Sequence, residues 1–313
     1  MKLSVQPPAP IGQSVWRLPV FYVIAAMALQ YAFFAVYHSA SYNDWQVSFL
    51  FDLTSLMAWF TAAFWVALRL IYRQLNSAVL GYLLDTNHLG RMSFFRKRAI
   101  TRLRNQALFA VVPAGAVWLF QFQGLLPGSL SRAFEQFASL LFWFSMTLFI
   151  LQCWSLPQFI YKYFLRHVPD SVVAISQQKQ LTSVLRNVLI MNVAAILALP
   201  VFMLLGQYLA LPCLLTTLVF SAVVLHTLAV MVRAGHNGAH FVQQAINRIE
   251  KKQYYLKRKS KHREDALRHA YKKLEVQKQQ LRQLPVSLLS ARLVALLVAC
   301  CFLLLAVWRV TAV

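Results

Sequence analysis

The sequence predicts an all-α, polytopic helical membrane protein with about seven transmembrane helices. Of its 313 residues, 59% are hydrophobic and only 13% are charged, and the mean hydropathy is +0.54. A soluble domain of this length carries about twice that charged fraction. Apolar runs of about 20 residues, the length that crosses about 30 Å of hydrocarbon, recur along the chain. Basic residues collect between alternate runs, which is typical of membrane proteins.

Seven segments are apolar enough to be predicted as transmembrane helices. They are residues 16–37, 46–68, 107–126, 137–159, 187–206, 209–232 and 286–307. They divide the chain into three parts. These are a six-helix transmembrane region at 1–233 with basic cytosolic loops at 73–106 and 160–186, a basic cytosolic helical hairpin at 234–285, and a seventh transmembrane helix at 286–313. The connections on the other side are short, so the sequence predicts no large domain there.

The positive charge is distributed unequally across the predicted membrane. All 31 Lys and Arg residues except Arg132 and Arg309 fall on one side. Because basic residues accumulate on the cytosolic flanks of transmembrane helices, we expect a cytosolic N-terminus and an extracytosolic C-terminus. The net charge of +22 is attributed to this bias rather than to nucleic-acid binding. Short loops and a strong charge bias favour a plasma membrane, the inner membrane of a bacterium.

A basic, amphipathic segment precedes the third predicted span. Its sequence is MSFFRKRAITRLRN, in which Phe and Leu side chains alternate with five cations. The cations are Arg96, Lys97, Arg98, Arg102 and Arg104. Such a helix suits the membrane interface, where its cations meet anionic lipid headgroups. A helix that docks a protein partner is the alternative.

The segment 234–285 shows two short heptad patterns. The first consists of Val242, Ile246, Ile249, Gln253 and Leu256, and the second of Leu267, Ala270, Leu274, Gln277, Leu281 and Leu284. Since the sixth span ends and the seventh begins on the same side, we expect an antiparallel hairpin projecting up to about 35 Å. Its tip is predicted near 259–261, with Glu264 and Asp265 opening the return helix. A helix that lies along the membrane is the alternative.

The predicted hairpin is strongly basic. It holds fourteen basic residues, counting from Arg233, against four acidic ones. The densest cluster comprises Lys257, Arg258, Lys259, Lys261 and Arg263. Such an excess predicts an anionic neighbour, either an acidic protein partner at the cytosolic face or anionic lipid.

Residues that could hold a metal or cofactor form no convincing pattern. His236 and His240 lie four residues apart on one helix face, the spacing of zinc ligands, but no carboxylate completes the motif. The four cysteines fall in apolar segments without a CxxC pair: Cys153, Cys213, Cys300 and Cys301. No phosphate-binding glycine loop or nucleophile elbow is present. The sequence therefore predicts no enzyme, no metal site and no cofactor.

These observations lead to a hypothesis of a non-enzymatic component of a larger membrane assembly. Its basic cytosolic helices dock an acidic partner or anionic lipid. The alternative is a small transporter or channel centred on Asp52, an acidic residue near the outer end of the second span. In that alternative, prolines break the helices along the path. They are Pro113, Pro157, Pro200 and Pro212. A membrane sensor with a separate effector is a third possibility.

Overall fold

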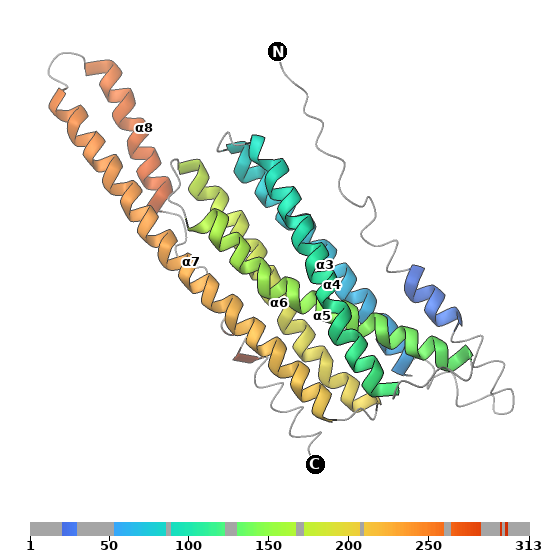
Figure 1. Ribbon diagram of the computed structural model, residues 1–313. Helices are drawn as coiled ribbons and strands as arrows, with labels where there is room; N and C mark the ends of the chain where they lie inside the picture. Colours follow the sequence, from blue (N-terminus) through green and yellow to red (C-terminus); the bar gives the residue numbers. More distant parts are fainter. Residues whose placement is uncertain are drawn as a thin grey trace.

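The computed structural model describes residues 21–29, 53–85, 89–122, 130–166, 172–206, 210–259, 264–282, 295, 298 and 299. After a helix at 21–29, the elements follow one another as helices (Figure 1). They are α3 (Leu53–Asp85), η1 (Leu89–Arg91), α4 (Met92–Phe122), α5 (Leu130–Ile160), η2 (Tyr161–Leu165), α6 (Val172–Gly206), α7 (Ala210–Lys259) and α8 (Glu264–Arg282). The described part of the chain is therefore all-α.

Five of the described helices are long and apolar enough to cross a membrane. They are α3 to α7, and each includes the described part of one of the second to sixth spans predicted from the sequence. The chain is thus a multi-pass helical membrane protein. The first predicted span is described only at 21–29 and the seventh only at 295, 298 and 299, so both lie largely outside the described residues.

The helices extend well beyond the predicted spans at one end of the bundle. The described residues of the predicted loop 73–106 belong to the last turns of α3, the 3₁₀ turn η1 and the first turns of α4. The helix α3 ends at Asp85 and α4 begins at Met92, and Gly90 belongs to the turn η1 before α4. The basic segment that begins at Met92 is therefore continuous with a membrane-crossing helix.

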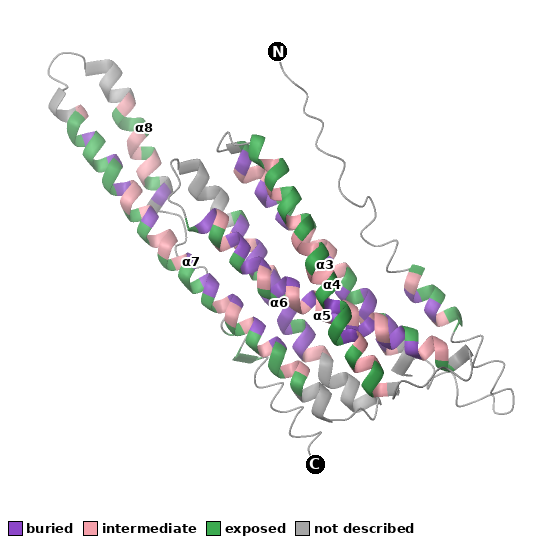
Figure 2. Ribbon diagram, in the orientation of Figure 1, coloured by how far each residue is buried: buried purple, intermediate pink, exposed green. Residues whose placement is uncertain are grey.

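Four of the helices form a ring. α3 packs on α5, α5 on α7, α7 on α6, and α6 on α3, while α4 lies outside the ring against α5. Figure 2 shows buried residues on the inner faces of α5 and α6. Only 11% of the apolar window of α4 is buried, against 44% for α3 and α5, so α4 is the edge of the bundle.

Aromatic side chains fill the space enclosed by these four helices. Phe64 of α3 lies 5.1 Å from Phe149 of α5, and Phe149 lies 6.1 Å from Phe220 of α7, measured between ring centroids. All three side chains are buried. Such tilted and offset pairs add to the stabilisation that comes from packing alone.

The proline-broken helices expected for a transport path are not found. Pro113 lies inside α4 and Pro157 inside α5, and both helices continue past them. The bounds of α6 and α7 likewise include Pro200 and Pro212. Membrane helices tolerate proline because neighbouring helices and local adjustments satisfy the freed carbonyl groups. The breaks that the transport alternative expects at Pro113 and Pro157 are therefore not observed.

We expect Phe149→Ala to lower the free energy of unfolding by about 3–5 kcal/mol, because it opens a cavity among the buried rings. The matched control is Phe120→Ala in α4, whose side chain is 76% exposed in the bundle. The measurement is the fraction of detergent-solubilised protein that stays monodisperse after heating. Equal losses for the two variants would contradict the packing described here.

Candidate interaction surface at the charged end

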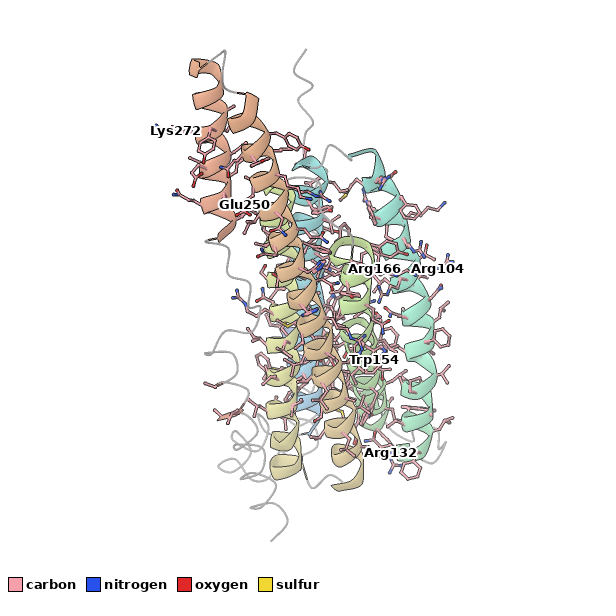
Figure 3. The ribbon with its side chains drawn as sticks, turned by 90° about the vertical axis from the view of Figure 1, so that its left-hand side faces the viewer. Arg104, Arg132, Trp154, Arg166, Glu250 and Lys272 are labelled. Carbon is pink, nitrogen blue, oxygen red and sulfur yellow. The ribbon has the colours of Figure 1, made fainter. Side chains whose placement is uncertain are left out.

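The described helices α4 to α7 each contain a long stretch without charged residues, whereas α3 carries Arg69 and Arg73 within its membrane-crossing span. We call the layer that the four stretches form the charge-free slab. No Lys, Arg, Asp or Glu occurs in residues 105–122 of α4, 136–160 of α5, 187–206 of α6 or 210–232 of α7. At 1.5 Å per residue these stretches are about 27 to 38 Å long, which matches the hydrocarbon thickness. In Figure 3, Arg104 and Arg166 lie at one level, and Arg132 lies at the opposite end. We call the end with Arg104, Arg166 and the hairpin the charged end.

A layer of polar side chains ties the helices together near the charged end. The Tyr72 hydroxyl of α3 donates a hydrogen bond of 2.7 Å to Gln152 Oε1 of α5. The Gln106 amide of α4 donates to Ser155 Oγ at 2.6 Å and to the Leu151 carbonyl at 3.1 Å. Each bond joins two different helices, so this layer fixes their register along the membrane normal.

Two further bonds extend this layer to α6 and α7. Asn187 of α6 donates to Gln74 of α3 at 2.8 Å. Asn237 of α7 donates to the Tyr161 hydroxyl at 3.1 Å, at the start of the π-helical turn η2. The turn widens the end of α5 and presents Tyr163 beside α4. Such turns often mark functional positions in helices.

Two of the arginines that were predicted to lie at the membrane interface contact aromatic side chains. The Arg98 guanidinium lies 5.1 Å from the Tyr163 ring centroid and 5.7 Å from that of Phe94. The Arg102 guanidinium lies 5.6 Å from the Phe159 ring. These distances fall within the range of cation–π attraction. Arg98 and Arg102 therefore help to pack α4 on α5 and η2.

The other predicted cations of α4 point away from the bundle. Arg96, Lys97 and Arg104 are exposed. A shallow depression of about 450 Å³ runs over this part of α4. It is lined by Met92, Ser93, Arg96, Lys97, Ile100 and Thr101. This mixture of cations, hydroxyl groups and apolar side chains suits the headgroup region of a membrane.

The helix α8 folds back on the last turns of α7 (Figure 1). Ile246, Ile249 and Leu281 form a buried apolar cluster between the two arms. The predicted tip is confirmed, because α7 ends at Lys259 and α8 begins at Glu264. Polar pairs border the cluster on its distal side. The Lys278 ammonium lies 2.9 Å from Glu250, and the Gln253 amide donates to Glu275 at 2.9 Å.

The remaining predicted site residues are only partly described. Lys257, Arg258 and Lys259 belong to the last turn of α7, but their side chains lie outside the described part of the structure. Lys261, Arg263 and Asp52 lie wholly outside it. The transport alternative, which depends on Asp52, therefore stays a prediction. Within the described residues, no group of three or more His, Cys, Asp or Glu side chains could hold a metal ion.

The sequence interpretation missed the polar layer. Tyr72, Gln106 and Gln152 had no assigned role, because a single uncharged polar residue within or beside an apolar run is ordinary in a membrane helix. One signal was available. Gln106 follows Phe95, Ala99 and Arg102 at helical spacing, and this is the face of α4 that turns toward α5.

Comparison with protein-family models, with curated proteins and with solved structures finds no match to this chain.

We expect Tyr72→Phe to lower the free energy of unfolding by about 1–3 kcal/mol, because it leaves Gln152 Oε1 buried without a donor. Adding Gln152→Leu should restore part of that loss, since both polar partners are then absent. Thermal unfolding in detergent measures both effects. Thr101→Val is the control, because the Thr101 hydroxyl bonds to its own helix at an exposed position. A Tyr72→Phe loss as small as that of the control would contradict the role of this layer.

Proposed function

We propose that this protein is a non-enzymatic component of a larger assembly in a plasma membrane, the inner membrane of a bacterium. Its N-terminus lies in the cytosol and its C-terminus outside. The charged end then faces the cytosol, as the positive-inside rule requires. The proposal is supported by the charge-free stretches of α4 to α7 and by the predicted confinement of all but two Lys and Arg residues to one side of them.

In this proposal α4 meets the lipid headgroups. The charge-free part of α4 begins directly after Arg104, and Arg96 and Lys97 lie about 11–12 Å farther from the membrane centre along the helix. The headgroup region is about 5–8 Å deep on each side, and long cationic side chains reach back toward it. Arg96, Lys97 and Arg104 are therefore placed to bind anionic lipid.

The observation that carries the assembly role is the continuity of α7. This helix of 50 residues begins within the ring, crosses the charge-free slab and ends at the tip of the hairpin. At about 75 Å it is more than twice as long as the hydrocarbon thickness. A partner bound to the hairpin is thus linked to the membrane bundle by one uninterrupted helix. This arrangement supports docking, with transmission of the contact into the membrane.

Extraction from the native membrane in a mild detergent tests this proposal. We expect a stoichiometric protein partner to elute with the full-length chain in size-exclusion chromatography and to be detected by native mass spectrometry. A particle that contains this chain alone would contradict the assembly role and favour the transport alternative.

The triple variant Arg96→Gln, Lys97→Gln, Arg104→Gln separates lipid binding from partner binding. We expect it to keep the protein partner but to retain at least about threefold less co-purified anionic phospholipid, since each cation near the surface contributes to lipid attraction. Lipid analysis of the purified particles by mass spectrometry gives this ratio. Unchanged lipid content would contradict the headgroup assignment of α4.

A further inference from the structure

The hairpin carries exposed positive charge beyond the reach of the membrane surface. Arg233 follows the charge-free part of α7 directly. Along the helix, Arg248 lies about 22 Å and Tyr255 about 33 Å past Arg233. When the headgroup region of about 5–8 Å is subtracted, these two residues lie two to three Debye lengths from the membrane surface. One Debye length is about 8 Å at physiological salt. The potential of an anionic surface falls to roughly a tenth over that distance, so lipid does not account for these charges.

The exposed charges lie in a defined pattern on α7. Arg248, Lys251, Lys252 and Tyr255 follow one another at i, i+3, i+4 and i+7, which places them on one helix face. We call these four residues the basic stripe. All four are exposed, and Tyr255 is 71% exposed. Lys272 and Lys273 of α8 are exposed at a similar height along the hairpin.

The described acidic residues of the hairpin leave the basic stripe uncompensated. Glu250 pairs with Lys278 and Glu275 accepts from Gln253, both between α7 and α8. Their carboxylates are thus engaged along the contact between the two arms. The outward face of α7 presents cations together with an exposed tyrosine ring.

We propose that the basic stripe binds an acidic α-helical segment of a protein partner. The inference rests on the proposed function, because it assumes that the hairpin lies in the cytosol. Carboxylates at i, i+3 and i+4 on such a helix match the spacing of the three cations of the stripe. Arg248 is suited to a bidentate contact with a carboxylate, and Tyr255 supplies the kind of aromatic anchor that dominates protein interfaces.

The shape of the hairpin favours a protein over nucleic acid. Two packed helices of about 10 Å each form a ridge about 20 Å wide. The major groove of DNA is about 12 Å wide and admits a single helix. A third helix lying along α7 meets no such restriction. The exposed Tyr254, Tyr271 and Val276 offer further apolar contact to a protein surface on either arm.

The experiment measures binding of a defined probe to the full-length protein in nanodiscs of phosphatidylcholine alone. The probe is a fluorescent alanine-based peptide of about 20 residues, long enough to be helical, with Glu at the matching spacing. The same peptide with Gln in place of Glu is the neutral control. We expect the stripe variant Arg248→Gln, Lys251→Gln, Lys252→Gln to weaken binding of the acidic peptide at least about tenfold.

A matched variant removes the same charge elsewhere at the charged end. Arg73→Gln, Arg166→Gln, Arg186→Gln alters three exposed arginines of the bundle and should change the Kd less than about twofold. Equal effects of the two variants, or none, would overturn the inference. So would tighter binding of a single-stranded oligonucleotide of equal length through the stripe. If the stripe variant loses binding to phosphatidylglycerol vesicles and the matched variant keeps it, the stripe binds lipid instead of a protein.

Extraction from the native membrane distinguishes this inference from the proposed function. We expect the stripe variant to lose a partner that the wild-type chain retains. If the partner stays with the stripe variant, the inference fails and the assembly role stands. If the wild-type chain has no partner, the proposed function fails, whatever the peptide binds.

Discussion

The exclusion of charge from the hydrocarbon is the constraint on which the structure depends. An ionised side chain at the centre of a bilayer is costly, so Lys, Arg, Asp and Glu are absent from long stretches of α4, α5, α6 and α7. The ring of α3, α5, α7 and α6 buries aromatic rings and small polar groups where the charges are absent. Every other feature, including the polar layer and the hairpin, takes its position from this slab.

Most of the polar layer lies within the half of the slab nearer the charged end, and the hairpin lies beyond the slab. Bonds such as Tyr72 to Gln152 join neighbouring helices inside the slab, and they fix the helices in register. Arg98 and Arg102 then pack on rings, while Arg96 and Lys97 point outward. Beyond them, the described residues of α7 and α8 share a small apolar cluster bordered by two polar pairs. The hairpin is thus a slender extension, and its surface is available for binding.

The sequence predicted the parts of the fold that depend on composition and periodicity. These include the order of the spans in α3 to α7, the end of one hairpin arm at Lys259 and the start of the other at Glu264. It did not predict continuity through Pro113 and Pro157, because neighbouring groups compensate for the lost hydrogen bonds in ways a single segment does not reveal. It also missed the polar layer, because pairs such as Tyr72 with Gln152 depend on which helices are neighbours in the ring.

The accessibility of spin labels along α7 in lipid nanodiscs shows whether the charge-free part of this helix crosses the hydrocarbon and whether the hairpin projects from the membrane. Labels are placed one at a time at exposed positions, namely Leu218, Leu225, Val232, His236, Gln243, Asn247 and Tyr254. We expect the labels at positions up to Val232 to be accessible to oxygen but not to a polar nickel chelate. Nickel accessibility should rise within about two turns and stay high to Tyr254. A constant, intermediate depth from His236 to Tyr254 would show that the hairpin lies along the membrane surface and would contradict the account.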